Sequence, residues 1–263
     1  MDIYSSGKSF LKRIPVWAFL AALFAMGILL KLLILRHTPF VSRDSFFYLR
    51  QIKDLYEMGV HDYYRNSPES NYPPMLFFLT LGFIHLGMDE LHAGLTVNIL
   101  LGSLFPVAGY FLAVEATGRK SIGMLGAVFL MLHPRLNELS VQVQRDIGYL
   151  FFSALVMWMM ICGVKRKKEW YWIGSGVFLS YAILFRTEAL EFLPIALIVV
   201  LVMLLKKEIK LKQASCCFAC FVLSLMLSFT VFTMSAGLKY RDVENIYGWS
   251  LKRINIPAVM ENP

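Results

Sequence analysis

The stretch that decides the fold is residues 16–35, VWAFLAALFAMGILLKLLIL. An α-helix of about 20 mostly apolar residues crosses the ~30 Å hydrocarbon core of a bilayer. No small-residue cleavage site follows this stretch, so we interpret it as a retained membrane-spanning helix and not as a cleavable signal.

The composition of the whole chain agrees with that interpretation. Of its 263 residues, 57% are hydrophobic and 17% are charged, whereas soluble domains have about 45–50% and about 25%. The apolar residues stand in long blocks and do not alternate with polar ones, which excludes a soluble enzyme, a disordered chain and an outer-membrane barrel. We therefore predict an all-α polytopic membrane protein, with residues 1–263 forming a single module.

We predict about seven membrane-spanning helices, at residues 15–35, 91–115, 121–132, 147–164, 170–185, 189–205 and 214–236. A further apolar piece at 75–88 is short for a span, and the basic residues decide how it lies. They form four runs between the apolar blocks: Lys8, Lys12 and Arg13; Arg119 and Lys120; Lys165, Arg166, Lys167 and Lys168; and Lys206, Lys207, Lys210 and Lys212.

All four runs fall on one side of the membrane only if residues 75–88 lie along its surface. Loops rich in Lys and Arg stay cytoplasmic, so we expect a cytoplasmic N-terminus, an external C-terminus and residence in membrane lipid, most simply the bacterial inner membrane. The net charge of +8 belongs to these short loops. Nucleic acid would need a continuous basic face, and we expect no nucleic-acid partner.

This topology leaves four external segments, of which residues 36–90 are the longest. Within this first outer loop, Ser42 is a candidate N-cap for an interfacial helix that ends at Gly59. Tyr72-Pro73-Pro74 then opens the helix at 75–88. The other external segments are residues 133–146, the turn at 186–188, and a tail at 237–263 whose Tyr240, Tyr247 and Trp249 suit a membrane interface.

Charged residues gather where these segments meet the membrane. Asp44 follows the first span, Arg145 and Asp146 precede the fourth, and Arg186 and Glu188 join two later spans. An ionised group at a helix centre costs about 2.5–3.5 kcal/mol, so such groups tend to face a cavity or a partner. Each also has a purely structural interpretation. The aspartates favour the dipole of a helix that begins there, and Arg186 and Glu188 form an interfacial pair.

The order of these features resembles a known enzyme class. The motifs are Ser42-Arg43-Asp44 after the first span, Tyr72-Pro73-Pro74 at a juxtamembrane helix, Pro134 followed by Asp146, and Arg186-Thr187-Glu188. The chain resembles the GT-C class of membrane-embedded glycosyltransferases, especially the family 39 and RgtA/B/C/D-like members, to which dolichyl-phosphate-mannose-protein mannosyltransferases are similar. The resemblance covers residues 15–205 approximately.

The resemblance implies an inverting transfer of a sugar from a polyprenyl-phosphate-linked donor to an acceptor on the outer face. In that scheme Asp44 is the catalytic base, Asp146 orients the acceptor or shares a divalent cation with Asp44, and Arg186 binds the phosphate. Further substrate contacts are expected from Tyr72, Glu138, Arg145 and Glu188. Hard divalent ions prefer several oxygen ligands, and the second acidic site is a single aspartate, so the need for a metal stays open.

Two other classes of function also remain open. A non-catalytic or partner-dependent membrane assembly subunit would bind a lipid-linked sugar without turning it over. A lipid or solute transporter would have broken helices in repeated halves around a midplane site, and that pattern is not evident. Cys217 and Cys220 have CxxC spacing, but no second pair completes a zinc site in the sequence.

Overall fold

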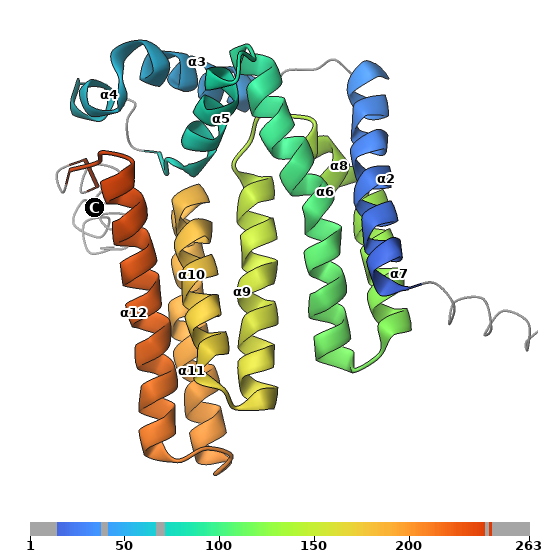
Figure 1. Cartoon of the computed structure of the whole chain (residues 1–263), viewed down its shortest axis with the longest axis vertical. Helices are drawn as coiled ribbons and strands as arrows, with labels where there is room; N and C mark the ends of the chain where they lie inside the picture. Colours follow the sequence, from blue (N-terminus) through green and yellow to red (C-terminus); the bar gives the residue numbers. More distant parts are fainter. Residues whose placement is uncertain (1–14, 38–41, 67–71, 240–241, 244–263) are drawn as a thin grey trace, which may run out of the picture.

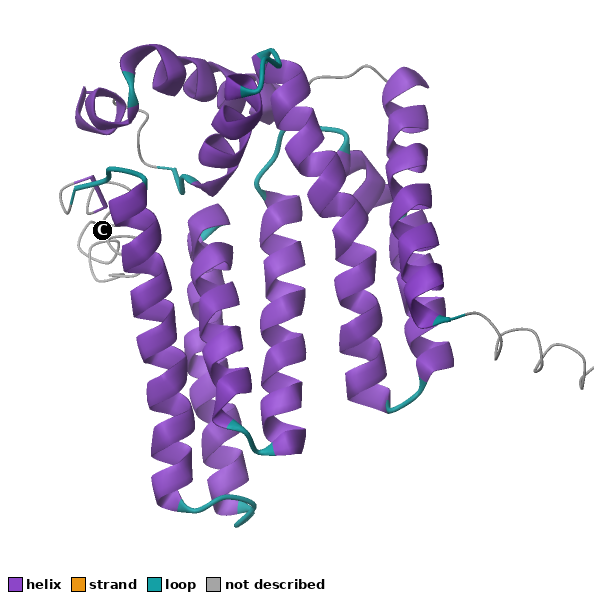
Figure 2. Cartoon of the chain, in the orientation of Figure 1, coloured by secondary structure: helices purple, strands orange, loops and turns teal. Residues whose placement is uncertain are grey.

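The computed structural model describes residues 15–37, 42–66, 72–239 and 242–243. Over these ranges the chain consists of helices joined by short loops, with no strand among them (Figure 2). This confirms the predicted all-α membrane fold. The first basic run, Lys8 to Arg13, and the tail aromatics Tyr240, Tyr247 and Trp249 lie outside the described residues.

The long helices run side by side and form a bundle (Figure 1). Each begins and ends close to a predicted span, because the apolar blocks that define the spans are bounded by charged or helix-breaking residues. They are α2 Val16–His37, α6 Glu90–Thr117, α7 Lys120–Leu132, α9 Asp146–Arg166, α10 Glu169–Phe185, α11 Phe192–Leu205 and α12 Leu211–Ser235.

Within the described residues, five segments are long and apolar enough to cross a membrane by length and composition alone. They are Val16–His37, Glu90–Thr117, Asp146–Arg166, Thr187–Leu205 and Leu211–Ser235. The helices α7 and α10 are shorter, with 13 and 17 residues, yet they lie alongside the others (Figure 1). The chain is an integral membrane protein, while the seven crossings and the cytoplasmic N-terminus stay predictions.

Three helices cover one end of the bundle, which we call the outer end after the predicted topology. They are α3 Arg43–Met58, α4 Val60–Asn66 and α5 Met75–His85 (Figure 1). The α3 helix has the predicted caps: the Ser42 hydroxyl accepts a hydrogen bond from the Ser45 amide at 3.2 Å, and Gly59 follows the last turn with φ 77°. The α5 helix spans only ~16 Å at 1.5 Å per residue, which is too short to cross the hydrocarbon core.

Two short elements complete the outer end, α8 Pro134–Ser140 and the 3₁₀ helix η1 Thr187–Glu191. Neither α4 nor α8 is predicted from the sequence, because seven residues make only two turns and show no clear apolar periodicity. The sixth predicted span starts at residue 189, where the structure has η1 instead, and α11 begins at Phe192.

Close contacts hold the bundle helices together, and an apolar cluster joins the outer end to them. A β-carbon at Gly148 of α9 would collide with the Phe185 ring of α10, and one at Gly176 of α10 would collide with the Phe221 carbonyl of α12. Small residues at these points allow the three helices to approach closely. A buried apolar cluster then joins α3 and α5 to the bundle through Ile52, Leu55, Leu76, Phe77 and Ile147.

Candidate active site

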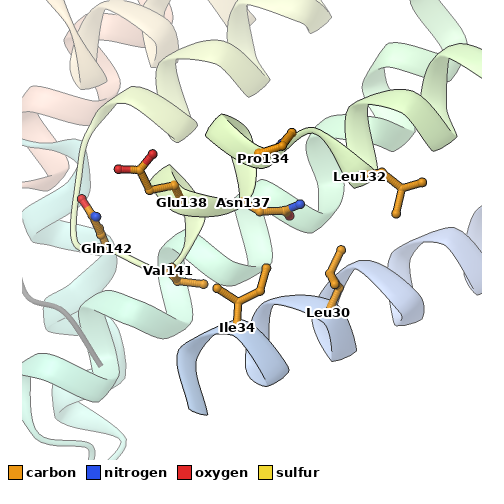
Figure 3. Close-up of a pocket in the computed structure, with 8 residues that line it drawn as sticks. All are labelled: Leu30, Ile34, Leu132, Pro134, Asn137, Glu138, Val141 and Gln142. Carbon is orange, nitrogen blue, oxygen red and sulfur yellow. The ribbon is translucent and has the colours of Figure 1, made fainter. Parts of the chain in front are cut away.

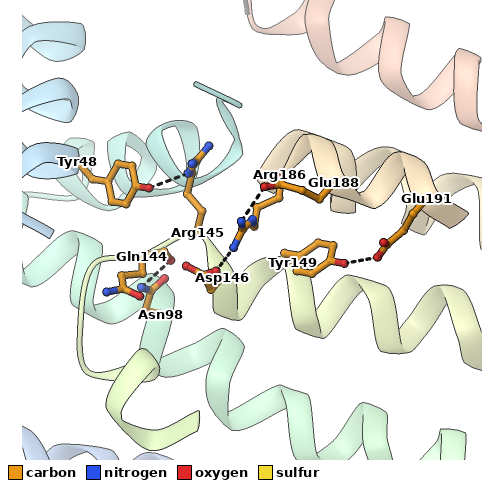
Figure 4. Close-up of polar contacts among 9 residues, drawn as sticks. All are labelled: Tyr48, Asn98, Gln144, Arg145, Asp146, Tyr149, Arg186, Glu188 and Glu191. Atoms are coloured by element: carbon orange, nitrogen blue, oxygen red, sulfur yellow. Dashed lines mark hydrogen bonds and ion pairs between the residues drawn. The ribbon is translucent and has the colours of Figure 1, made fainter. Parts of the chain in front are cut away.

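Three of the predicted site residues, Asp146, Arg186 and Glu188, meet at the outer end (Figure 4). Asp146 is the first residue of α9, and Arg186 directly follows α10. The Arg186 guanidinium forms an ion pair with Asp146 and a second with Glu188, whose Oε1 lies 2.7 Å from Nη2. The side chains of Asp146 and Arg186 are each about one-third exposed, so this ion-pair network is accessible from outside.

Arg145 lies beside the ion-pair network but is held differently. Its Nε donates to the Tyr48 hydroxyl at 3.1 Å, and its guanidinium carbon lies 5.1 Å from the centre of the Tyr48 ring and 4.8 Å from that of Tyr72. Within the described residues, no carboxylate forms an ion pair with Arg145. Two aromatic rings stabilise its charge instead, while the nearby Glu188 carboxylate acts on it electrostatically without forming an ion pair with it.

Tyr48 connects Arg145 to the two aspartates predicted to be catalytic. Burial raises the pKa of Tyr48 above its ordinary value, Arg145 opposes that rise, and the carboxylates of Asp146 and Asp44 add to it. The phenol therefore stays neutral at physiological pH. Asp44 lies one helical turn before Tyr48 on α3, and Arg145, which binds the Tyr48 hydroxyl, directly precedes Asp146. Tyr48 thus links the two aspartates, although about a hundred residues separate them in the sequence.

Asp44 is the second residue of α3, and its side chain is exposed. In the described part of the chain its carboxylate makes no hydrogen bond or ion pair. A carboxylate in the first turn also favours the helix dipole, so its position suits both a catalytic and a structural role. An exposed carboxylate with no partner in the described residues is chemically able to accept a proton.

Two polar side chains that are not among the predicted site residues support this region. Asn98 of α6 donates from Nδ2 to the backbone carbonyls of Gln142 and Gln144, the latter at 2.9 Å. Tyr149 of α9 donates to Glu191 Oε1 at 2.8 Å. The available sequence signal was an asparagine inside an apolar helix, because polar groups at membrane depth are found with a partner.

The family model of the dolichyl-phosphate-mannose-protein mannosyltransferases matches the chain over residues 71–233. The matched stretch is more than half of the 263 residues. The chain belongs to this family. No curated protein matches it. Membership confirms the resemblance drawn from the sequence motifs, and it makes the chain a membrane glycosyltransferase of the GT-C type.

The family match includes most of the predicted site. Tyr72, Asp146 and Arg186 fall within residues 71–233, and Asp44 precedes them. Dolichyl-phosphate mannose is a polyprenyl-phosphate-linked sugar, so membership in this mannosyltransferase family implies that class of donor. The roles of the individual side chains stay predictions.

Glu138 lies apart from the other residues predicted for this mannosyltransferase site. It is on α8, where its carboxylate pairs with Arg135 at 2.7 Å. It lines a pocket of about 630 Å³ between α2 and α8 (Figure 3), together with Leu30, Ile34, Leu132, Pro134, Asn137, Val141 and Gln142. That lining does not include Asp44, Arg145, Asp146 or Arg186. The structure therefore does not bring Glu138 together with the ion-pair network.

The described residues contain no group of three or more His, Cys, Asp or Glu side chains placed to hold a metal ion. A cation shared by Asp44 and Asp146 stays a prediction, and Asp146 already has an ionic partner in Arg186. The four cysteines are free thiols, and three of them, Cys216, Cys217 and Cys220, lie on α12.

Proposed function

We propose that this chain transfers a sugar, with inversion, from a polyprenyl-phosphate-linked donor to a hydroxyl acceptor on the outer face of the membrane. One observation carries the proposal. Arg145 is a partly buried arginine without an ion-pair partner in the described part of the chain; it directly precedes Asp146, and its Nε binds Tyr48, which lies one helical turn after Asp44 on α3. Such a site offers a cation for a departing phosphate and a base for the acceptor proton.

Arg145 suits the donor phosphate better than Arg186 does. A phosphate at Arg186 would compete with Asp146 and Glu188, which already pair with it. Arg145 uses its Nε for Tyr48, and within the described residues its two terminal amino groups are left for phosphate oxygens, which a guanidinium binds in a forked geometry. We therefore exchange the roles expected from the sequence: Arg145 binds the phosphate, and Arg186 orients Asp146.

The proposed reaction has one displacement step. The acceptor oxygen attacks the anomeric carbon from the face opposite the phosphate, so a new C–O bond forms while the C–O bond to the phosphate breaks. The phosphate leaves with the electron pair as polyprenyl phosphate, its charge stabilised by Arg145. The acceptor proton passes to the carboxylate of Asp44. Because a lipid phosphate is already a good leaving group, no strong general acid is needed.

The test uses the purified full chain in lipid nanodiscs with radiolabelled polyprenyl-phosphate mannose and a panel of peptide and glycolipid acceptors. We expect release of polyprenyl phosphate and a product of inverted anomeric configuration. Donor binding without release across the panel would instead indicate the assembly-subunit function. A chain that binds neither this donor nor other polyprenyl-phosphate sugars would overturn the proposed donor class.

The role of Asp44 is tested in the same assay. Asp44→Asn keeps the shape of the side chain and removes the base, so turnover should fall by ~10²–10⁴ while donor binding survives. The matched control is Asp54→Asn on the same helix, a partly exposed carboxylate paired with Arg50 at 4.0 Å, which should leave turnover unchanged. If Asp44 serves only the helix dipole, its loss costs less than ~1 kcal/mol of stability and does not change turnover.

A further inference from the structure

The segment that carries Arg145 is an unusual piece of backbone. Residues 141–145 connect α8 to α9 without helical structure, and Val141, Gln142, Val143 and Gln144 are all buried. Buried amides and carbonyls outside a helix need partners from elsewhere in the protein, and this need is strongest at the membrane boundary. The hydrogen bonds that hold this segment therefore determine where Arg145 and Asp146 lie.

Asn98 holds the segment from the side of the bundle (Figure 4). Its side chain is fully buried in α6, and its Nδ2 donates to the carbonyls of Gln142 and Gln144. One turn earlier in α6, a β-carbon at Gly94 would come within 2.9 Å of a Val143 methyl. The absence of a side chain at Gly94 thus makes room for Val143, and Asn98 bonds the residues on either side of it.

The start of α3 holds the same segment from the outer side. The Val143 amide donates to the Ser45 hydroxyl at 3.2 Å, and the Gln144 side chain donates to the Ser42 hydroxyl at 3.3 Å. Asp44 lies between these two serines in the sequence. The segment is therefore clamped between α6 and the very turn of α3 that presents Asp44.

We propose that Asn98 is a positioning residue. It fixes the position of Arg145 and Asp146 relative to Asp44. Asn98 does not reach the reacting atoms itself and acts through residues 142–144. The effect of this clamp on catalysis rests on the proposed function, whereas its effect on the segment does not. A displacement of about 1 Å between catalytic groups is able to lower a rate by about 10²-fold.

The test variant is Asn98→Leu, which keeps nearly the same shape and removes both N–H donors. Leucine favours membrane insertion of a helix, so we expect the variant to insert and fold. The matched control is Ser103→Ala on the same helix. Ser103 is also buried, and its hydroxyl has no hydrogen-bond partner within the described residues, so its removal loses no bond.

Hydrogen exchange of the full chain in nanodiscs measures the clamp without any substrate. In Asn98→Leu we expect the amides of residues 142–145 to exchange at least about tenfold faster, while those of α9 and α12 keep their wild-type rates. Ser103→Ala should exchange like the wild type. Unchanged exchange at residues 142–145 in Asn98→Leu, or a uniform rise over the whole bundle, would overturn the positioning role.

Kinetics then measure what the clamp does for the reaction. For Asn98→Leu we expect kcat to fall by about 10–100-fold with less than a threefold change in the KM for polyprenyl-phosphate mannose, and no change in either for Ser103→Ala. Faster exchange at residues 142–145 together with wild-type kcat would contradict the proposal. If the wild-type chain itself transfers no sugar, the proposed function fails, and the exchange measurement still decides whether Asn98 holds the segment.

Discussion

Each end of α9 has an arginine that contacts tyrosine rings, with carboxylates nearby. Within the described residues, only the arginine at the inner end forms an ion pair. At the inner end, Arg166 forms an ion pair with Glu115 at 2.7 Å and its guanidinium carbon lies 5.0 Å from the centre of the Tyr171 ring. At the outer end, Arg145 has comparable ring contacts with Tyr48 and Tyr72. The outer arginine, however, has no carboxylate paired with it in the described part of the chain.

The inner cluster is explained by helix packing alone. Lys165 donates to the Glu115 and Ala116 carbonyls, which are near the C-terminus of α6, where cations are favoured by the helix dipole. Together with Arg166 it ties the end of α9 to the end of α6. The comparison teaches that an arginine beside a tyrosine is not by itself a functional sign. An arginine that is held in place but forms no ion pair within the described residues is a better candidate for binding an anion.

The largest effect we expect from this comparison is at the outer arginine. Arg145→Gln removes the charge that would bind the donor phosphate, and a charge-assisted hydrogen bond contributes ~1.5–3 kcal/mol. We expect kcat/KM for polyprenyl-phosphate mannose to fall by about 10–150-fold, which steady-state assays in nanodiscs would measure. Arg166→Gln is the matched control and should retain wild-type kcat/KM. Equal losses of kcat/KM in both variants would contradict a specific role of Arg145 in binding the donor phosphate.

Keeping the charge but changing its shape should have a smaller effect. Arg145→Lys retains a cation and loses the forked donors and the planar contact with Tyr48 and Tyr72. We expect donor affinity to drop by about tenfold, measured by equilibrium binding of the labelled donor. Affinity equal to that of the wild type would mean that Arg145 serves only as a point charge.

The ion-pair network offers a test of coupling between two residues. Asp146→Asn removes one of the two ion pairs of Arg186 and leaves the pair with Glu188, and the acceptor loses its orienting carboxylate. We expect turnover to fall by about fivefold to tenfold, and a double-mutant cycle with Arg186→Gln to give a coupling of about 0.5–3 kcal/mol. Strictly additive losses would contradict a role for Arg186 in orienting Asp146.

The smallest expected effect is at the inner end. The Arg166 side chain is 48% exposed, and exposed ion pairs contribute about 0–1 kcal/mol. Arg166→Gln should therefore lower the free energy of unfolding by less than ~1 kcal/mol, followed by thermal denaturation in nanodiscs, with no change in sugar transfer. A larger loss of stability would show that the ion pair between Arg166 and Glu115 stabilises the fold more than its exposure implies.

Much of the fold follows from the sequence because membrane helices are specified locally. An apolar block of about 20 residues with charged ends defines its own limits, and the caps Ser42 and Gly59 act on their immediate neighbours. The short helices α4 and α8 escaped prediction because they contain too few residues for a periodic signal. Their formation depends on packing against the rest of the outer end.

The sequence predicts which residues belong to the candidate site better than it predicts how they are arranged. Asp146, Arg186 and Glu188 were expected together because all lie at one membrane boundary, and the structure pairs them. Whether an arginine forms an ion pair depends on residues distant in the sequence. The sequence therefore does not predict that Arg186 is paired with carboxylates while Arg145 has no ion pair within the described residues. Glu138 lies near the same boundary, yet on α8 its carboxylate pairs with Arg135, and no spacing pattern separates it from the other candidates.

The clamp on residues 142–145 also has a consequence for the order of biosynthesis. Ser45 precedes its partner Val143 by 98 positions, and at ~5–20 residues per second the ribosome needs about 5–20 s to make that stretch. During that interval α3 exists without the segment it will hold. Its apolar face, which includes Tyr48, Ile52 and Leu55, is suited to rest on the membrane surface meanwhile. The amphipathic character of α3 thus suits the nascent chain, before α3 packs against the rest of the folded protein.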